Sequence, residues 1–356
     1  MVVVVREGAS PEERDEIARI LASRAGGYIP TPIHTSQGEV FCLPRGAATP
    51  EAEAQLQSLA GVERVLPLAT AYQLASRAFQ PEKTVVQVGE ARIGGDEPVV
   101  IAGPCSVESE EQILEAARAA RAAGAQVLRG GAFKPRTSPY AFQGLGLRGV
   151  ELLAQAGAAA GLPIVTEVME PGFVAEVAAL SDILQVGSRN MQNYPLLRAV
   201  GRSGRPVLLK RGFASTVEEW LLAAEYILAE GNPNVILCER GVRSYDPQTR
   251  NLLDLTCVPL LSGLTHLPVI VDPSHATGKR ELVLPMGIAA IAAGADGLIV
   301  EMHPRPDEAL SDAAQTIDPA TLRQLVRRSH VVHAALLADV AEHASEGELV
   351  GSETSG

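Results

Sequence analysis

Eight short apolar runs recur between residue 98 and about residue 302 of this 356-residue chain. They read PVVIAG, AQVLRGG, LPIVTEV, DILQVGS, RPVLLKRG, NVILCERG, LPVIVDPSH and DGLIVEM. Each is apolar almost throughout, which is typical of strands buried on both faces of a parallel sheet. Segments rich in Ala, Leu and Glu separate the runs, and this composition favours helices. Eight strands alternating with helices predict an α/β fold, a (β/α)₈ TIM barrel over residues 98–343.

An open, doubly wound sheet is the alternative architecture for alternating strands and helices. A glycine-rich GxGxxG turn would be expected after the first strand of such a sheet, and none is present here. One helix-start signal is also specific. Ser215 and Glu218 have the spacing of a capping box, which predicts the start of the helix in STVEEWLLAAEYILAEG.

The residues before the barrel have a different pattern of apolar and turn-forming residues. We expect strands at 2–6, 28–35, 39–45 and 62–68 and helices at 11–25 and 48–61. The order βαββαβ is that of a ferredoxin-like domain, over residues 1–70. Residues 71–97 would form a linker, whose TVVQVGEARIGG segment we expect to be a hairpin covering the barrel floor. The polar tail, residues 344–356, is expected to be disordered.

Composition excludes several classes of protein. The net charge of −12 argues against nucleic acid or an anionic membrane as a partner. No apolar run reaches the roughly 20 residues that a membrane span requires. The N-terminal MVVVVREGAS has too short an apolar part for a signal peptide, and the four cysteines form no CxxC pair. We therefore expect a cytoplasmic protein with reduced thiols.

Polar and charged side chains follow the apolar runs, where the active sites of such barrels lie. Four of these residues offer metal-ligand atoms of mixed type: Cys105, His275, Glu301 and Asp312. A set with one thiol and one imidazole suits Mn²⁺, Fe²⁺, Zn²⁺ or Co²⁺ better than Ca²⁺ or Mg²⁺. Taken singly, a buried structural cysteine and a hydrogen-bonded histidine remain alternatives.

The same strand ends carry many cations. They are Arg129, Lys134, Arg136, Arg189, Lys210 and Arg240, with Lys279 and Arg280 as weaker candidates. These charges would repel one another unless ligands neutralise them, and substrates with a carboxylate and two phosphates would do so. Salt bridges to Glu167, Glu239 and Asp272 are the alternative for two or three of them.

The motifs IAGPCSVES, LRGGAFKPRTSPYAFQGLG, QVGSRNMQN, LLKRG, CERG, DPSHATGKR and EMHPRPDEALSDAAQ together resemble a known family. It is 3-deoxy-D-arabino-heptulosonate 7-phosphate (DAHP) synthase, in the short-barrel form shared with 3-deoxy-manno-octulosonate 8-phosphate synthase. The resemblance covers roughly residues 83–335. KPRTS at 134–138 favours the heptulosonate enzyme, since octulosonate synthases resemble KANRS there.

The resemblance implies a transferase that condenses phosphoenolpyruvate with erythrose 4-phosphate and releases phosphate, the first step of the shikimate pathway. It implies that Cys105, His275, Glu301 and Asp312 hold a divalent metal that polarises the aldehyde. The residues implied for phosphoenolpyruvate are Arg129, Lys134, Arg189, Lys210 and Arg240; those for erythrose 4-phosphate are Pro135, Arg136, Thr137 and the amide of Ser188. Lys134 is a candidate proton donor and Glu167 a candidate for positioning water.

Residues 1–70 resemble the regulatory domain of one branch of these synthases, which implies feedback inhibition by tyrosine or phenylalanine, commonly in a homotetramer. His34 is one candidate effector contact. Three alternatives stay open: an octulosonate 8-phosphate synthase, a barrel metallohydrolase, and a catalytically dead barrel that senses an amino acid. The first strand lacks the HxH usual in barrel amidohydrolases, and the intact strand-end ligands argue against a dead barrel.

Overall fold

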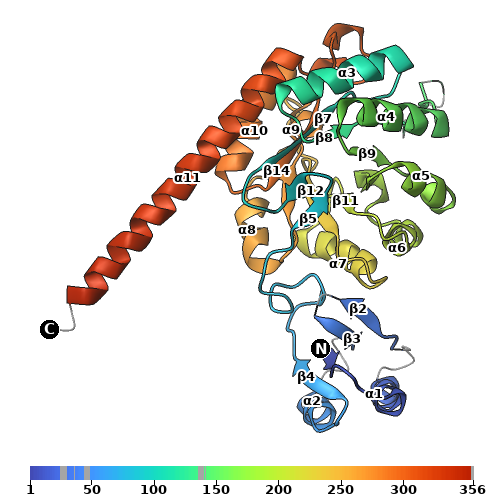
Figure 1. Ribbon diagram of the computed structural model, residues 1–356, viewed down its shortest axis with the longest axis vertical. Coiled ribbons are helices and arrows are strands. Elements are labelled where there is room, and N and C mark those ends of the chain that lie inside the picture. The colour runs from blue at the N-terminus through green and yellow to red at the C-terminus, as the bar shows by residue number, and fades with distance from the viewer. Residues whose placement is uncertain (25–29, 36, 44–48, 135–139, 141, 354–356) are drawn as a thin grey trace.

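A computed structural model describes residues 1–353, except residues 25–29, 36, 44–48, 135–139 and 141. Its main body is a closed barrel of parallel strands in the order β10-β11-β12-β13-β14-β7-β8-β9 (Figure 1). The eight strands are Val99–Gly103 (β7), Val127–Arg129 (β8), Ile164–Glu167 (β9), Ile183–Val186 (β10), Val207–Lys210 (β11), Val235–Glu239 (β12), Val269–Val271 (β13) and Gly297–Glu301 (β14). All eight apolar runs are barrel strands, so the predicted α/β barrel is confirmed.

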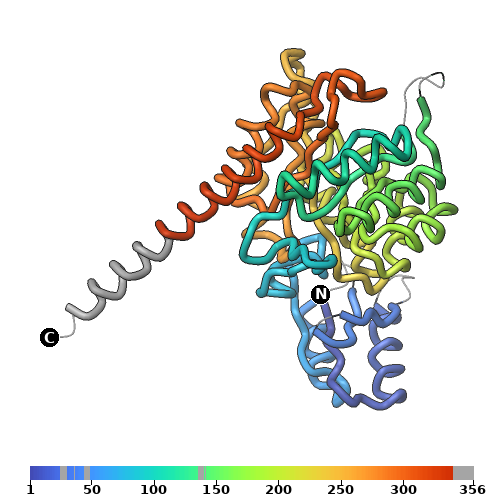
Figure 2. Tube along the Cα trace, turned by 45° about the horizontal axis from the view of Figure 1, so that its top comes forward, coloured from blue at the N-terminus to red at the C-terminus, as the bar shows by residue number. Residues whose placement is uncertain are grey.

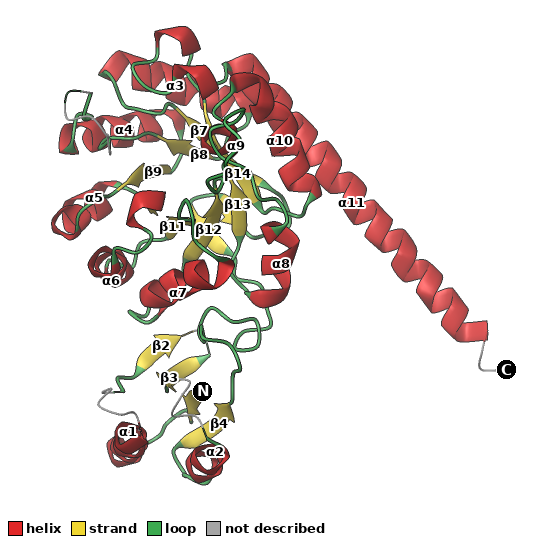
Figure 3. Ribbon diagram, turned by 180° about the vertical axis from the view of Figure 1, so that it is seen from behind, coloured by secondary structure: helices red, strands yellow, loops and turns green. Residues whose placement is uncertain are grey.

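Helices surround the barrel in a ring (Figure 3). The ring consists of Glu110–Ala123 (α3), Leu147–Ala160 (α4), Val174–Leu180 (α5), Tyr194–Arg202 (α6), Val217–Leu228 (α7), Cys257–Leu264 (α8), Arg280–Ala292 (α10) and Pro319–Glu353 (α11). The short helix Pro273–Thr277 (α9) follows β13 directly at the C-terminal end of the barrel. Short 3₁₀ turns lie at Pro171–Phe173, Ser188–Asn190, Pro306–Glu308 and Ala313–Gln315. The capping box of α7 is formed by Thr216 and Glu219, one residue later than Ser215 and Glu218. The register shifts because the Glu219 carboxylate also accepts a bond from the backbone N–H of Thr216.

The barrel strands bury both of their faces. In β7, for example, Ile101 joins the cluster inside the barrel, while Val100 and Ala102 pack outward among the helices. Side chains alternate between the two faces of a strand, so a strand that is covered on both sides must be apolar throughout. This arrangement explains why the strands appear as continuous apolar runs.

A hairpin closes the N-terminal end of the barrel. Its strands are Val86–Val88 (β5) and Ala91–Ile93 (β6), paired antiparallel. Val86, Val88 and Ile93 are almost fully buried in the same cluster as the inward-facing strand residues. The hairpin thus completes the apolar interior from below.

The N-terminal unit is an antiparallel sheet in the order β2-β3-β1-β4 with two helices. Its elements are Val2–Val5 (β1), Pro11–Arg24 (α1), Ile33–Thr35 (β2), Gly38–Cys42 (β3), Pro50–Gln57 (α2) and Val62–Leu66 (β4). Side chains on one face of the sheet, including Phe41, pack with Ile17 and Leu56 from the two helices. The opposite face, including Val2 and Val40, joins the core that continues into the barrel. Figure 2 shows the unit next to the barrel, with the connecting chain between them.

A buried carboxylate fastens the connecting chain to the barrel. Glu225, in α7, accepts hydrogen bonds from the backbone N–H groups of Gln73, Leu74 and Ala75 at 2.8–3.0 Å. His266 binds the carbonyl of Leu74 through Nε2 at 2.8 Å. These bonds satisfy backbone groups that would otherwise be buried without partners.

The last helix changes one expectation about the chain. α11 packs against α10 and α3 and then runs on, well away from the barrel, to Glu353 (Figure 1). The sequence led us to expect a disordered tail from residue 344, whereas the helix continues through most of it. Extending an existing helix by one residue is easier than starting a new one, so α11 continues despite Gly347 and Gly351. Within the described part of the chain, no helix combines the length and the apolar character needed to cross a membrane.

Candidate active site

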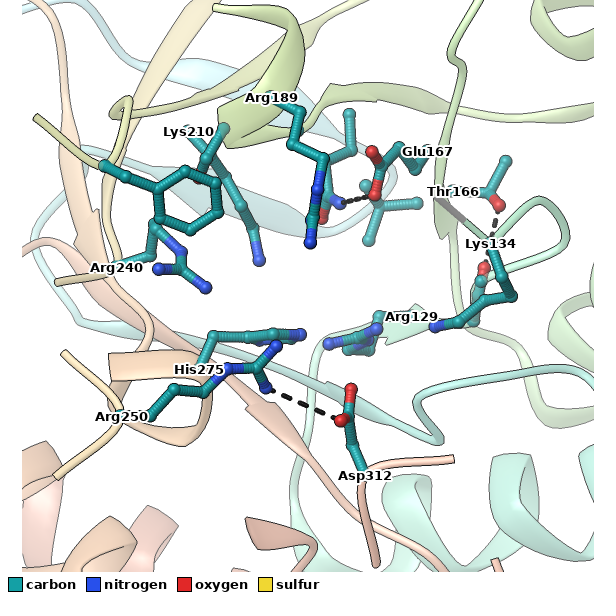
Figure 4. A pocket seen from close by; sticks show the side chains of 17 residues that line it. Arg129, Lys134, Thr166, Glu167, Arg189, Lys210, Arg240, Arg250, His275 and Asp312 are labelled. Carbon is teal, nitrogen blue, oxygen red and sulfur yellow. Dashed lines mark hydrogen bonds and ion pairs between the residues drawn. The ribbon is translucent and has the colours of Figure 1, made fainter. Parts of the chain in front are cut away.

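A cavity of about 200 Å³ opens at the C-terminal ends of the barrel strands (Figure 4). Its lining residues are Arg129, Gly130, Gly131, Lys134, Val165, Thr166, Glu167, Gln185, Gly187, Ser188, Arg189, Lys210, Phe213, Arg240, Arg250, His275 and Asp312. They come from several separate strands, because the strands of a closed parallel barrel all end on the same rim. Most of the strand-end residues chosen from the sequence therefore face one space.

Three of the four candidate metal ligands form a compact group. Ligand atoms of Cys105, Glu301 and Asp312 all lie within 4.8 Å of one another. The thiol of Cys105 lies 3.1 Å from Oδ2 of Asp312. Cys105 follows β7 and Glu301 ends β14, two strands that are paired in the barrel. Asp312 comes from the loop after β14, where it has a φ of 53°, the only positive φ among the described non-glycine residues.

His275 completes this group from the neighbouring strand. Asp272 caps α9, with Pro273 at the first helical position, a combination that favours helix initiation directly after β13. The short helix turns the imidazole back, so that Nδ1 lies 2.7 Å from the Asp272 carboxylate. Nε2 then lies 3.2 Å from Oε1 of Glu301. A carboxylate behind one ring nitrogen is the usual partner of a histidine that binds metal through the other.

One atom in the group has no hydrogen-bond partner. Oε1 of Glu301 is buried and accepts no hydrogen bond from any described residue, although Glu301 is fully buried. The ring of His275 and the guanidinium of Arg129 lie 3.2 and 3.3 Å from this oxygen, but neither forms a hydrogen bond to it. The oxygen can therefore serve as a ligand to a divalent ion, which would offset the cost of burying it. The donor set of one thiol, one imidazole and two carboxylates thus fits a divalent ion of the Mn²⁺ to Zn²⁺ series.

The protonation of these ligands also depends on the surrounding charges. Burial raises the pKa of the Cys105 thiol to about 12, and Glu301 adds to this rise. Burial also opposes ionisation of Glu301, but the charges of His275 and Arg129 outweigh it and hold the pKa of Glu301 well below its usual range. Glu301 is therefore a carboxylate, while the thiol requires a nearby cation to ionise.

Two cations lie directly against the ligand group. Nζ of Lys134 lies 2.8 Å from both the carbonyl oxygen and Sγ of Cys105. Nη1 of Arg129 lies 3.3 Å from Oε1 of Glu301. Both cations are buried, so water screens their attraction to the carboxylates and the thiol only weakly.

Two of the strand-end cations are neutralised by buried carboxylates. Lys210 donates to Asp272 at 2.5 Å, and Arg211 lies 3.1 Å from Glu239. Burial alone would raise the pKa of Asp272, but the charges of His275 and Lys210 hold it well below its usual range. Salt bridges within the chain thus explain part of the positive charge at the cavity, as the alternative reading of the sequence allowed.

Other cations at the cavity have no such partner. Arg189 and Arg240 form no salt bridge with a carboxylate among the described residues; both guanidinium groups lie over the ring of Phe213, at 5.4 and 4.6 Å. Burial lowers the pKa of Arg240, and Asp272 opposes this effect. Arg243 approaches the same ring at 5.6 Å. Arg189 and Arg240 line the cavity and leave it with positive charge that an anionic ligand can neutralise, whereas Arg243 lies outside it.

Glu167 is held in the cavity wall by its neighbours. Nε2 of Gln185 donates to its Oε2 at 3.1 Å. A Cβ at Gly187 would lie only 2.1 Å from Oε1 of Glu167, so the carboxylate can occupy this position only because residue 187 is glycine. Glu167 pairs with an amide here, not with a cation as the sequence allowed.

The remaining substrate contacts predicted from the sequence have different outcomes. Pro135, Arg136 and Thr137 lie outside the described residues. Ser188 lines the cavity, and its buried hydroxyl has no hydrogen-bond partner among the described residues. The weaker candidates Lys279 and Arg280 do not line the cavity, and Arg280 instead pairs with Asp307 at 2.7 Å.

Among the residues at this site that sequence reasoning missed are Thr166, Gln185, Phe213, Arg250 and Gln315. Gln185 left a signal, since it is the only polar side chain within the apolar strand ILQV. Arg250 lies in the long connection between β12 and α8, and Gln315 follows Asp312 in the loop after β14. Neither of these two positions has a periodic pattern that would place it near the strand ends.

Comparison with known proteins agrees with this geometry. Residues 77–336 match the model of the DAHP synthetase I family. A relative from Thermotoga maritima named phospho-2-dehydro-3-deoxyheptonate aldolase is 44% identical over 329 residues, 92% of this chain and 96% of the relative. A 2-dehydro-3-deoxyphosphooctonate aldolase from Bradyrhizobium diazoefficiens is 34% identical over 263 residues, 68% of this chain and 93% of the relative.

A solved structure extends the match to three dimensions. The crystal structure of the Thermotoga maritima phospho-2-dehydro-3-deoxyheptonate aldolase (DAHP synthase) superposes with a TM-score of 0.74 at 42% identity. The match covers 94% of this chain and 97% of the other. The family match spans more than half of the chain and includes all the strands that form the cavity. The chain therefore belongs to the DAHP synthetase I family.

Proposed function

We propose that this protein is a 3-deoxy-7-phosphoheptulonate synthase, which condenses phosphoenolpyruvate with erythrose 4-phosphate and water to give DAHP and phosphate. The family match and the names of the Thermotoga maritima relatives support this activity. The observation that carries it is the cavity itself, in which excess positive charge lies directly beside a buried metal-ligand group. The carboxylate and the phosphates of the two substrates match the positive charge of the cavity. The aldehyde of the second substrate matches the metal-ligand group.

Cations on one side of the cavity would bind phosphoenolpyruvate. The proposed contacts are Arg129, Lys134, Arg189, Lys210 and Arg240. Arg189 and Arg240 support this role best, because no carboxylate of the described residues neutralises them. Their planar guanidinium groups suit bidentate binding of phosphate or carboxylate. Pro135, Arg136, Thr137 and the amide of Ser188 are proposed for erythrose 4-phosphate by resemblance alone.

Cys105, His275, Glu301 and Asp312 would hold the divalent metal, whose identity among Mn²⁺, Fe²⁺, Zn²⁺ and Co²⁺ stays open. When bound, such an ion supplies Lewis-acid polarisation of the aldehyde oxygen. Oε1 of Glu301 accepts no hydrogen bond from the described residues, and His275 is backed by the Asp272 carboxylate; both observations support this assignment.

The chain's own side chains then bind, orient and transfer protons. A carbon–carbon bond forms between C3 of phosphoenolpyruvate and the aldehyde carbon, and a proton is required at the aldehyde oxygen. Lys134 is the proposed donor, because its ammonium is buried beside Cys105. Water adds at C2 of phosphoenolpyruvate, and one of its protons restores the ammonium of Lys134. The C2–O bond to phosphate then breaks, and the second water proton leaves with the phosphate as C2 becomes a ketone. Glu167, held by Gln185, is proposed to orient that water.

An octulosonate 8-phosphate synthase is the nearest alternative. The relatives with that specificity match a shorter share of this chain at lower identity than the heptulosonate relative does. KPRTS at 134–138 also favours the heptulosonate enzyme, although residues 135–138 lie outside the described part of the structure.

One assay separates these possibilities. Phosphate release from phosphoenolpyruvate would be measured with erythrose 4-phosphate and with arabinose 5-phosphate, each with and without a chelator. We expect release with erythrose 4-phosphate only, loss on complete metal removal, and recovery on adding Mn²⁺. Preference for arabinose 5-phosphate would exclude the proposed substrate, and activity without any metal would exclude the proposed metal site.

Residues 1–70 are proposed to be a ferredoxin-like regulatory domain. The strand order β2-β3-β1-β4 and the two helices on one face support this assignment. By resemblance, tyrosine or phenylalanine would inhibit through this domain in a homotetramer. His34, the candidate contact, is exposed on β2 and borders a small pocket with Phe79 and His266.

Deletion of residues 1–70 tests the regulatory assignment. We expect a truncated enzyme that retains activity and is no longer inhibited by tyrosine or phenylalanine. The full-length chain assayed with each amino acid is the reference. If the truncated protein loses its activity as well as its response to the amino acids, the domain is structural.

A further inference from the structure

Two side chains outside the proposed ligand set connect its two carboxylates. Nε2 of Gln315 donates to Oε2 of Glu301 at 2.5 Å. Nη1 of Arg250 donates to Oε1 of the same glutamine at 3.0 Å and lies 3.5 Å from Oδ1 of Asp312. Figure 4 shows Arg250 reaching Asp312 across the rim of the cavity. Glu301 and Asp312 are thus joined by a chain of hydrogen bonds, which we call the Arg250–Gln315 clamp.

The clamp occupies one oxygen of each carboxylate and leaves the other. Oε1 of Glu301 has no hydrogen-bond partner among the described residues, while Oε2 is bound by Gln315. Oδ2 of Asp312 faces the thiol of Cys105, while Oδ1 faces Arg250. Oε1 of Glu301 and Oδ2 of Asp312 therefore face the residues that could hold an ion, whereas Oε2 of Glu301 and Oδ1 of Asp312 belong to the clamp.

The orientation of the glutamine amide follows from its partners. A carboxylate on one side requires the NH₂ group of Gln315, and a guanidinium on the other requires its carbonyl. Gln315 is 2% exposed, so water does not compete for these bonds. A glutamate or a lysine at this position could satisfy only one of the two neighbours, whereas an amide satisfies both.

The backbone around Asp312 depends on the same short segment. Its carbonyl oxygen accepts bonds from the N–H of Gln315 and from the hydroxyl of Thr316, at 3.2 and 2.9 Å. These bonds hold Asp312 in the left-handed conformation, which is uncommon for a non-glycine residue. The 3₁₀ turn Ala313–Gln315 thus places the aspartate and the glutamine together.

We propose that Arg250 and Gln315 are positioning residues that orient Glu301 and Asp312 toward the divalent ion and thereby set its affinity. Neither residue is among the proposed ligands or substrate contacts. This inference rests on the proposed metal site. Partners that hold metal ligands by hydrogen bonds commonly change metal affinity 10–100-fold when they are removed.

Manganese binding to the metal-free, full-length protein tests the proposal. Free Mn²⁺ would be followed by electron paramagnetic resonance during titration of wild type, Gln315→Leu, Arg250→Met and the double variant. We expect the Kd for Mn²⁺ to rise about 10–100-fold in each single variant. The double variant should be little weaker than Gln315→Leu, because either change breaks the same chain.

Gln73→Leu is the matched control, since Gln73 is a buried glutamine that donates to the carbonyl of Leu43, far from the cavity. Its Mn²⁺ affinity should equal that of wild type, and the thermal midpoints of the metal-free proteins would report on folding. The guanidinium arm of Arg250 is 41% exposed, so Arg250→Met remains a test if Gln315→Leu does not fold.

The outcomes distinguish the clamp from the metal site itself. Wild-type Mn²⁺ affinity in Gln315→Leu and Arg250→Met would overturn the clamp and leave the metal site standing. Equal weakening in Gln73→Leu would also overturn it, since the effect would then not be specific. Absence of Mn²⁺ binding by the wild-type protein would overturn the metal site and the clamp together.

Discussion

The two ends of the barrel are made by the same eight strands and yet have opposite character. At the N-terminal end, inward-facing side chains such as Ile101 and Ile299 pack against the β5–β6 hairpin in a continuous apolar cluster. At the C-terminal end, buried charged residues such as Arg129, Lys134 and Lys210 line a cavity. We call these regions the base and the mouth.

The difference shows where the barrel derives stability and where it carries chemistry. At the base, apolar burial stabilises the fold, with about 25 cal/mol for each Å² removed from water. At the mouth, the attraction within each buried ion pair is about as large as the cost of removing the two charges from water. These ion pairs therefore contribute little net stability. Truncating an apolar side chain at the base should therefore reduce stability with little effect on turnover. Substitutions at the mouth should change binding and activity, and removing one partner of a buried ion pair there should also cost stability.

Cys105→Ser should have the largest effect on the mouth. Loss of the soft thiolate ligand should weaken metal binding and reduce activity about 1,000-fold, since a metal ion contributes several kcal/mol to such catalysis. Phosphate release and the thermal midpoint of the metal-free protein would be measured. Cys42→Ser, in the N-terminal sheet, is the control and should be fully active. A fully active Cys105→Ser enzyme would remove the thiol from the proposed site.

Lys210→Met should affect both activity and stability. Removing one partner of a buried ion pair leaves Asp272 without a neutralising ammonium, and such changes cost about 3–5 kcal/mol. Denaturant unfolding would measure the loss, and the KM for phosphoenolpyruvate should rise. The control is Lys83→Met at the base, where a half-exposed ion pair with Asp296 contributes about 0–1 kcal/mol. Equal losses of unfolding free energy in the two variants would contradict the expected difference between a buried ion pair at the mouth and a half-exposed one at the base.

Ile93→Ala should destabilise the base and leave the mouth intact. The side chain is fully buried in the hairpin, and removing it should cost about 2–5 kcal/mol of unfolding free energy. Urea unfolding would measure this cost, and kcat at 25 °C should equal that of wild type. A fall in kcat without loss of stability would mean that the base controls the cavity.

His266→Gln should have the smallest effect, visible as a change in pH dependence. Burial lowers the pKa of His266, which binds Thr84 and the carbonyl of Leu74. The folded state therefore keeps the ring neutral, and this contribution to stability is full above about pH 6.5, the ordinary pKa of histidine. It is lost as the pH falls from 6.5 toward the lowered folded-state pKa.

Thermal midpoints between pH 7.5 and 5.5 would test this expectation. The midpoint of the wild-type protein should fall more steeply with acid than that of His266→Gln. His34→Gln provides an exposed control on β2. Parallel curves for wild type and His266→Gln would show that His266 titrates alike in both states.

Local patterns predicted the parts of the fold that depend on local physics. Apolar runs predicted all eight barrel strands, because a strand covered on both faces must be apolar along its length. Strand ends predicted the closeness of Cys105 and Glu301, because parallel strands end at one rim. The start of α7 was misplaced by one residue, since Ser215 and Thr216 are equally good caps and only the fold selects one.

Other parts of the site could not be predicted from patterns. Arg250 lies in a long irregular connection, and Gln315 lies in a loop whose course depends on the left-handed conformation of Asp312. Which cations are neutralised was also open. Asp272 pairs with Lys210, and Glu167 pairs with an amide, choices that depend on distances of a few ångströms between separate strands.

The sequence by itself determined the barrel, its order of strands and helices, and the kinds of side chain at its mouth. Hydrophobic periodicity and residue chemistry act locally, and both can be read along the chain. Only the tertiary structure decided which oxygen of Glu301 accepts no hydrogen bond and which residues join this carboxylate to Asp312. Such pairings depend on contacts between residues far apart in the sequence, where small shifts in position make or break a hydrogen bond.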